Sequence, residues 1–139
     1  MGLTIYGIGA SRASRPFWAA LELGVPFEHI VQSYKDGGTR TPEFLAINPN
    51  GHIPAMVDER PEGKVTVWES MACALYIARV HGRADGQSIT PSSAREEAEA
   101  LRWSFWTVTG PSGRSSTSTG MWPLGLIARN PGVRVPPFL

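Results

Sequence analysis

A proline at the entrance to an apolar run is the feature that most restricts how this chain can fold. Pro54 opens that run within the segment NPNGHIPAMVD, which extends from Asn48 to Asp58. Proline has no backbone N–H to donate to a neighbouring strand, so within a sheet it stands on an edge strand, at the first residue of a strand or at a bulge. The sequence therefore predicts a strand over Ile53–Val57 in which Pro54 takes one of these three places.

The residues before this segment alternate between strand and helix patterns. Leu3–Tyr6 is short and rich in β-forming residues, which predicts a buried strand followed by a loop. Ser14–Leu23 combines a serine at the capping position, an early proline and apolar residues at helical spacing, so we predict a helix that Gly24 ends. A second strand is predicted over Phe27–Val31 and a short helix over Pro42–Ile47.

The residues that follow the predicted third strand favour a hairpin and a helix. Residues 58–63 are typical of a turn, and Lys64–Trp68 alternates polar and apolar positions as an antiparallel partner strand does. Glu69–Val80 carries the strongest helical pattern of the chain, with an acidic residue at its start and a basic residue near its end, where the helix dipole stabilises those charges. The whole order, βαβ, short helix, ββα, predicts an α/β domain over residues 1–82.

The chain changes character after this domain. Residues 83–92 are polar and aperiodic, as is typical of a linker. Residues 93–106 resume a helical pattern with a serine cap and an acidic first turn. The apolar face of this helix is predicted at Leu101, Phe105 and Trp106. Residues 107–139 are dense in Gly, Ser, Thr, Pro and Arg and include no acidic residue, so we expect an irregular, disordered segment there.

Composition and charge exclude several classes of function. The 139 residues carry a formal net charge of +1, which gives no electrostatic basis for binding nucleic acid or an anionic membrane surface. No apolar run reaches the roughly 18 residues that a membrane span needs, and the first residues lack a secretory leader pattern, so we expect a cytoplasmic location. The single cysteine, Cys73, excludes an internal disulfide and a cysteine-based zinc site; no metal site is expected, and Cys73 is predicted to be a small core residue.

Three separated motifs carry the strongest indication of function. They are LTIYGIGASRASRPFWAALELGVPFE, FLAINPNGHIPAMVD and VWESMACALYIARVHG, and together they cover most residues from Leu3 to about Gly82. In this order and at these spacings they resemble the N-terminal domain of the soluble glutathione S-transferases. The resemblance implies a thioredoxin-like fold for residues 1–82, glutathione as the co-substrate, and a cis peptide bond before Pro54 at the start of the third strand.

The same resemblance assigns residues to the parts of glutathione. The backbone N–H and C=O of Ile53, which precedes Pro54, are expected to pair with the cysteinyl backbone, as a short added strand would. Glu69 is expected to bind the γ-glutamyl ammonium group, while Ser70 and the N–H groups at the start of its helix bind the carboxylate. His52 could reach the glycyl carboxylate, although a solvated loop histidine fits the sequence equally well.

A serine in the loop after the first strand is implied as the catalytic residue. A thiol with a pKa of about 8.5 is mostly protonated at neutral pH, whereas the thiolate is the nucleophile. A hydroxyl donor and a nearby helix N-terminus stabilise the thiolate and so lower the pKa of the thiol. Ser11 is the first candidate for this donor and Ser14 the alternative, although Ser14 also stands where a helix cap is expected. Arg15 and Lys35 could complement the two carboxylates of glutathione, but surface positions are expected for both.

The resemblance ends inside the second domain. Family members continue with an all-helical domain that forms most of the pocket for a small electrophile and much of the homodimer contact. This chain offers the first helix of such a domain, residues 93–106, so we expect a truncated protein with weak or no transferase activity, and its dimerisation is left open. The reaction class implied is glutathione transfer, or the glutathione-dependent isomerisation of the maleylacetoacetate isomerase group.

A non-catalytic role is the alternative. Domains of this fold also serve as glutathione-binding or protein-interaction modules, and loss of glutathione binding on substitution of Glu69 or Ser70 would distinguish a ligand site from an interaction module. A thioredoxin-type disulfide reductase is not expected, because the loop after the first strand contains no cysteine.

Overall fold

The structure is a computed structural model that describes residues 2–82 and 89–109. Within these ranges one mixed sheet has the strand order β2-β1-β3-β4. The strands are β1 (Gly2–Gly7), β2 (Phe27–Val31), β3 (Ala55–Arg60) and β4 (Gly63–Trp68). The helices are α1 (Ser14–Glu22), α2 (Pro42–Leu45), α3 (Ser70–Val80) and α4 (Ala94–Thr109), with a short 3-10 helix at Gly38–Arg40. The predicted order of βαβ, short helix and ββα is confirmed.

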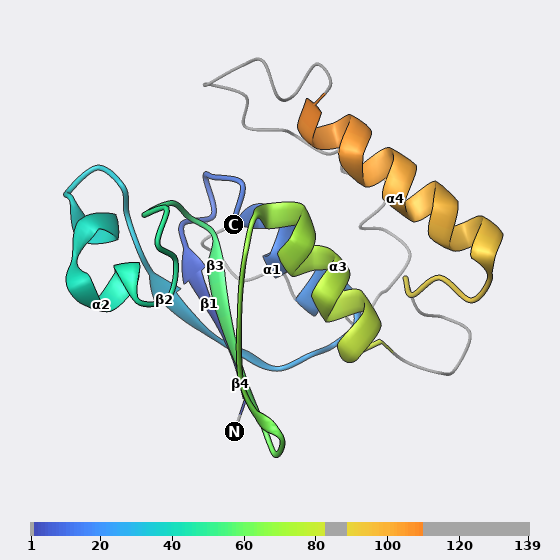
Figure 1. Ribbon diagram of the computed structural model, residues 1–139, viewed down its shortest axis with the longest axis horizontal. Coiled ribbons are helices and arrows are strands. Elements are labelled where there is room, and N and C mark those ends of the chain that lie inside the picture. Colours follow the sequence, from blue (N-terminus) through green and yellow to red (C-terminus); the bar gives the residue numbers. More distant parts are fainter. Residues whose placement is uncertain (1, 83–88, 110–139) are drawn as a thin grey trace.

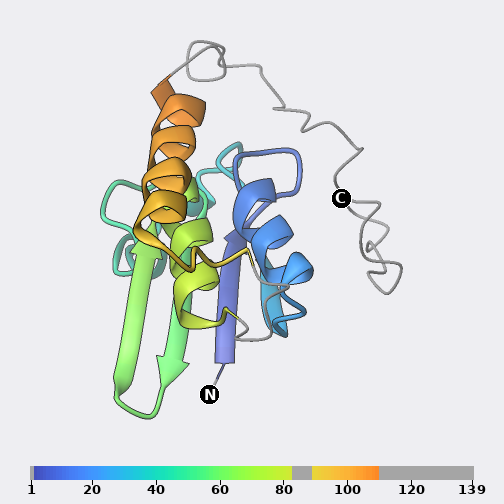
Figure 2. The ribbon, with the colours of Figure 1, turned by 90° about the vertical axis from the view of Figure 1, so that its right-hand side faces the viewer.

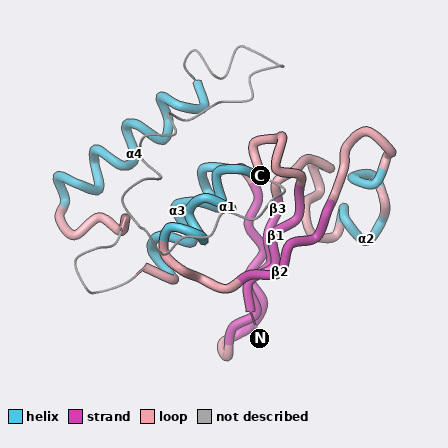
Figure 3. The backbone as a smooth tube through the Cα atoms, turned by 180° about the vertical axis from the view of Figure 1, so that it is seen from behind, coloured by secondary structure: helices cyan, strands magenta, loops and turns pink. Residues whose placement is uncertain are grey.

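Helices cover both faces of the sheet. Figures 1 and 3 show α1 and α3 side by side on one face and α2 on the other. The alternation of side chains along β1 explains this arrangement, because Leu3 and Ile5 point into the core under α1 and α3. Tyr6 points to the other face, where its ring packs edge-to-face on Phe44 of α2 with 6.1 Å between ring centroids.

The core between the sheet and the two long helices is apolar. Its largest fully buried side chains include Phe17 from α1, Met56 from β3 and Ile77 from α3. Each such side chain contributes roughly 1.5–3 kcal/mol to folding on burial. Cys73 belongs to the same core, and burial, followed by the charge of Glu69, raises the pKa of Cys73 to about 12. A thiol with that pKa stays protonated at neutral pH, so Cys73 is the small core residue that was predicted and not a nucleophile.

The third strand is shifted along the chain relative to its prediction. β3 begins at Ala55 and runs to Arg60, whereas the sequence pattern placed it over Ile53–Val57. Part of the predicted turn, residues 58–60, therefore belongs to the strand, and Asp58 is buried in it. Polar residues at these positions are typical of a turn, but here Tyr76 of α3 and His81, the residue after that helix, hydrogen-bond to the Asp58 side chain.

The serine cap predicted for the first helix is wrong. Ala13 occupies the N-cap position of α1 in a helical backbone conformation, and no side chain caps the helix. The backbone N–H of Ser14 donates instead to the carbonyl oxygen of Ser11, at 3.1 Å, within the turn that leads into the helix. The end of the loop is thus already turned like a helix, which leaves no extended residue to act as a cap.

The last described helix stands apart from the core. α4 runs beside α3 on the side away from the sheet, and an ion pair between Arg79 and Glu97 links the two (Figures 1 and 2). The helix extends to Thr109, so residues 107–109, which were predicted to be irregular, are helical. The predicted linker residues 83–88 and the remainder of the predicted tail, 110–139, lie outside the described residues.

The side chains predicted to form the apolar face of α4 are exposed. Leu101, Phe105 and Trp106 are all exposed, Phe105 to 64 % of its surface, while Ser104 is the buried residue of this helix. None of the helices in the described ranges combines the length and the apolar character that a membrane span requires.

Candidate functional site

The sheet register brings the three sequence motifs to one end of the molecule. In neighbouring strands Tyr6 of β1 stands opposite Ala55 of β3, which stands opposite Trp68 of β4. The serine-bearing loop follows β1, Ile53 and Pro54 come just before Ala55, and Glu69 follows Trp68 directly. These segments therefore meet at the end of the sheet that lies away from the β3–β4 hairpin (Figure 1).

A glycine allows two of these segments to approach each other. A Cβ atom placed on Gly7 would lie 2.6 Å from the Cβ of Ala13 and 3.8 Å from the Cβ of Ile53. The first distance is shorter than van der Waals contact, so a side chain at position 7 would push away the start of α1. The missing side chain thus keeps the loop after β1 close to Ile53.

The segment before β3 contains the proline singled out in the sequence. The Ile53–Pro54 peptide bond is cis, the conformation that the family resemblance implies. Among the described residues, the N–H and C=O of Ile53 take no hydrogen-bond partner. His52 is exposed, and its Nδ1 lies 2.6 Å from the carbonyl oxygen of Asn50. Asn48, which the sequence analysis did not single out, is buried and donates to the carbonyl oxygen of His52 at 2.7 Å.

The junction of β4 and α3 carries the second predicted pair. Glu69 occupies the N-cap position of α3 with φ 72° and ψ 122°, a left-handed conformation that costs a non-glycine residue of order 1–3 kcal/mol. Its carboxylate is exposed and caps no N–H of the helix. Ser70, the first residue of α3, is buried, and its Oγ accepts a hydrogen bond of 2.8 Å from Nη1 of Arg15.

Arg15 is not the surface charge that was expected. Its side chain is 9 % exposed, and it joins the first turn of α1 to the first turn of α3 through Ser70. Burial, and then the positive charge of Arg12, lower the pKa of Arg15 from its ordinary value. No local pattern marks this contact, because the two residues are 55 positions apart in the sequence. Lys35 is exposed, as expected.

The two candidate serines differ in their surroundings. The Ser11 hydroxyl donates to the carbonyl oxygen of Ile8 at 2.6 Å and accepts from the N–H of Ala13 at 3.1 Å. The Ser14 side chain is half-buried and takes no hydrogen-bond partner among the described residues. Either hydroxyl stands in the first part of α1 or just before it, so the geometry does not choose between the two candidates.

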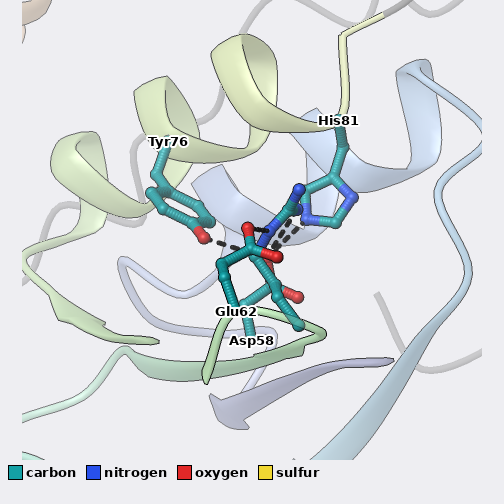
Figure 4. Close-up of polar contacts among 5 residues, drawn as sticks. Asp58, Glu62, Tyr76 and His81 are labelled. Atoms are coloured by element: carbon teal, nitrogen blue, oxygen red, sulfur yellow. Dashed lines mark hydrogen bonds and ion pairs between the residues drawn. The ribbon is translucent and has the colours of Figure 1, made fainter. Parts of the chain in front are cut away.

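A second polar cluster lies farther along β3, and the sequence analysis missed it. The buried carboxylate of Asp58 accepts hydrogen bonds from the hydroxyl of Tyr76 and from Nε2 of His81, both at 2.9 Å (Figure 4). Nη1 of Arg60 lies 3.4 Å from the same oxygen and Nε donates to Glu62 at 2.7 Å. Burial raises the pKa of Asp58, but hydrogen bonds from His81, Tyr76 and Arg60 outweigh burial and hold it below its ordinary value.

This cluster fastens the second half of α3 to β3. Hydrogen bonds join Asp58 to Tyr76, His81 and Arg60. No fully buried side-chain nitrogen or oxygen in the described ranges lacks a partner. In residues 2–82 and 89–109, no group of three or more His, Cys, Asp or Glu side chains could hold a metal ion. The cluster around Asp58 is therefore a structural contact, and the predicted binding residues lie at the other end of β3.

The first domain of this chain matches known proteins. The family model described as glutathione S-transferase, N-terminal domain, matches residues 11–80. The protein URE2 of Candida albicans is 32 % identical over 90 residues, which are 64 % of this chain and 26 % of that protein. The glutathione S-transferase-like protein gedE of Aspergillus terreus is 32 % identical over 108 residues, which are 78 % of this chain and 46 % of that protein. The chain thus spans less than half the length of these relatives.

Solved structures show the same fold. The theta class glutathione S-transferase of Xanthomonas axonopodis pv. citri, with glutathione bound, has a TM-score of 0.68 and 31 % identity, over 81 % of this chain and 52 % of that one. Ure2p in complex with glutathione has a TM-score of 0.72 at 23 % identity, over 81 % of this chain and 44 % of that one, and so shows the fold alone. The match over residues 11–80, half of the chain, places this protein in the glutathione S-transferase family, through its N-terminal domain.

Proposed function

We propose that this protein binds glutathione at the end of the sheet where β1, β3 and β4 bring the three motifs together, and that it activates the glutathione thiol for attack on a small electrophile. The observation that carries the proposal is the set of groups left available there. Ile53 offers a backbone N–H and C=O, Glu69 an exposed carboxylate, and Ser70 a hydroxyl at the start of α3. The glutathione bound in the 31 % identical theta class structure supports the choice of ligand.

Each part of glutathione has a matching group in this site. The cysteinyl backbone would extend the sheet by pairing with Ile53, as an added strand does. The γ-glutamyl ammonium group would pair with the carboxylate of Glu69, and its carboxylate would accept from Ser70 and the first N–H groups of α3. His52 is exposed and could reach the glycyl carboxylate. The donors and acceptors thus fit a peptide with charges at both ends.

The chemistry would begin with loss of the thiol proton to solvent. A serine hydroxyl then stabilises the thiolate by donating a hydrogen bond and keeps its own proton throughout. The sulfur lone pair then forms a bond to the electrophilic carbon, and the electron pair of the bond that breaks there departs with the leaving group, such as the halide of an aryl halide. Ser11 is the first candidate, in which case its hydroxyl must release the carbonyl oxygen of Ile8, and Ser14 remains the alternative. The chain supplies thiolate stabilisation and positioning, and the electrophile supplies the reactive bond.

Turnover is expected to be weak. In the described residues, α4 is the one helix that follows the first domain, and its apolar side chains are exposed. No described element packs against them to form a pocket for an electrophile. The chain spans 46 % of its relative gedE, so whole-protein activity and dimerisation stay predictions, as does the cytoplasmic location.

Isothermal titration calorimetry with glutathione tests the proposal. We expect saturable binding by the wild-type chain and a loss of about tenfold or more in affinity for Glu69→Ala and for Ser70→Ala, because each removes a charge-assisted hydrogen bond. Glu59→Ala is the matched control, since Glu59 is an exposed glutamate on β3 toward the hairpin. Absence of heat with the wild-type protein, together with no rise of its melting temperature in glutathione, would refute the proposal.

A non-catalytic module is the second candidate. The exposed apolar side chains of α4 favour it, because exposed aromatic groups on one helix face are typical of an interaction surface. Binding of glutathione without measurable conjugation of an aryl halide would select this reading, whereas conjugation at rates typical of full-length enzymes would exclude it.

A further inference from the structure

Arg15 is a buried cation with one neutral partner. One of its guanidinium N–H groups donates to Oγ of Ser70, and an arginine side chain has five such donors. In the described part of the chain, no carboxylate pairs with Arg15 and no other acceptor takes its remaining side-chain donors. Because no fully buried side-chain nitrogen there lacks a partner, those remaining donors keep contact with solvent. They are therefore accessible to a ligand.

A buried guanidinium group without a negatively charged partner lowers the stability of the fold unless an anion binds beside it. A guanidinium group keeps its proton at all relevant pH values, so burial cannot neutralise it. Removal of a charge from water without a counter-ion is unfavourable, and the neighbouring positive charge of Arg12 adds repulsion. A carboxylate bound beside Arg15 would offset both effects.

The contact with Ser70 also fixes the direction of a second donor. Because the Arg15 N–H occupies a lone pair of the Ser70 oxygen, the hydroxyl hydrogen of Ser70 must point elsewhere. Ser70 is the first residue of α3, whose leading N–H groups have no partner inside the helix. The guanidinium, the hydroxyl and the helix start thus meet around one position.

We propose that Arg15 is a specificity-determining residue, which positions Ser70 and supplies the charge that makes this site select a ligand with an α-carboxylate. The inference rests on the proposed function, since the ligand is the γ-glutamyl end of glutathione. It goes further by assigning the selectivity to a residue of α1, outside the pair at the start of α3.

Two ligands that differ in one group test the inference. The first is glutathione, and the second is 4-aminobutyryl-cysteinylglycine, which lacks only the γ-glutamyl α-carboxylate. Calorimetry on the wild-type chain should show a preference of about tenfold or more for glutathione. Arg15→Gln should bring the ratio of the two affinities close to one, by weakening glutathione alone. Arg15→Lys should keep part of the preference, because it keeps the charge but loses the planar fork.

A structural role alone would give a different result. If Arg15 only maintained the fold, Arg15→Gln would weaken both ligands equally and leave their ratio unchanged, and that outcome overturns the inference. Arg102→Gln, which removes an exposed arginine of α4, is the matched control and should change neither affinity. Circular dichroism checks that each variant folds. If Arg15→Gln does not fold, the double variant Arg15→Lys with Ser70→Ala replaces it. A ratio of the two ligand affinities in that double variant equal to the wild-type ratio overturns the inference.

The wild-type measurement separates this inference from the function on which it rests. Absence of binding for both ligands overturns the proposed function together with the inference. Equal binding of both ligands leaves the proposed function standing and overturns the inference alone.

Discussion

The two ends of β3 use polar side chains in opposite ways. Near the hairpin, the buried carboxylate of Asp58 takes hydrogen bonds from Tyr76 of α3, from His81 just after that helix and from its own strand. At the other end, the buried guanidinium of Arg15 has one neutral partner, the backbone of Ile53 has none in the described chain, and the Glu69 carboxylate is exposed. Polar groups that satisfy one another hold a fold together, whereas groups held in place without partners mark where a ligand can bind.

The largest effect on stability is expected when the charge of Asp58 is removed. Asp58→Asn should lower the free energy of unfolding by about 2 kcal/mol, because it weakens the charge-assisted bonds from Tyr76 and His81. Urea denaturation measures the loss, and the affinity of the folded variant for glutathione should stay at the wild-type value. Glu62→Gln is the control, since this exposed pair with Arg60 contributes little. If Asp58→Asn kept the wild-type stability but bound glutathione more weakly, Asp58 would belong to the ligand site and not to the contacts that stabilise the fold.

Acid should act on the Asp58 end. The folded-state pKa of Asp58 lies below its ordinary value, so its contribution to stability is fully present above the unfolded pKa of about 3.9 and is lost as the pH falls through the folded value. Wild-type protein should therefore lose more stability than Asp58→Asn between neutral pH and acid. Urea denaturation of both proteins over a pH series checks this. Parallel curves for the two would show that Asp58 does not contribute to the pH dependence.

At the other end of β3, a substitution at Glu69 should raise stability while it weakens glutathione binding. Glu69→Gly relieves the left-handed backbone at position 69 and should raise the free energy of unfolding by about 1 kcal/mol. The same change removes the carboxylate proposed to bind the ammonium group, so glutathione affinity should fall. Glu69→Ala separates the two effects, because it keeps the backbone penalty while losing the carboxylate. A Glu69→Gly variant less stable than Glu69→Ala would show that the conformation is not strained.

The smallest expected change in stability is at Ser11, the first candidate for the serine that would contact the glutathione sulfur. Ser11→Ala should lower the free energy of unfolding by less than about 1 kcal/mol, because the two hydrogen bonds of its hydroxyl are only partly buried. It should also raise the pKa of the bound glutathione thiol toward about 8.5, the value of a free thiol, as followed by the ultraviolet absorbance of the thiolate. Ser14→Ala is the paired variant. If only Ser14→Ala raises that pKa, Ser14 takes the role.

The sequence predicted well those features that depend on neighbouring residues. Apolar spacing and turn residues located each α-helix and strand of the first domain, although β3 lies farther along the chain than predicted, and the pattern of residues 93–106 located most of α4. The apolar residues of α4 were also identified, although the structure leaves them exposed. The family resemblance, rather than periodicity, directed attention to Ile53, Glu69 and Ser70, whose binding roles stay predictions.

What the sequence could not predict depends on contacts between distant residues. Asp58 has the composition of a turn residue, and Tyr76 and His81 make it a buried strand residue. Arg15 is a residue type usually found on the surface, but its hydrogen bond to Ser70 accompanies a buried position. Each side chain was placed wrongly because its partner lies on another element, and no local pattern records such a partner.

The register of the β3–β4 hairpin has a further consequence. Ala55 lies opposite Trp68, so the length of chain between them determines how far Glu69 stands from Ile53. One residue added within β4 would shift the pairing by about 3.3 Å and turn alternate side chains to the other face. One residue added at the turn, between Pro61 and Glu62, would extend a loop and leave the pairing unchanged. The spacing of the two segments proposed to bind glutathione is therefore encoded in strand length, at a distance from both of them.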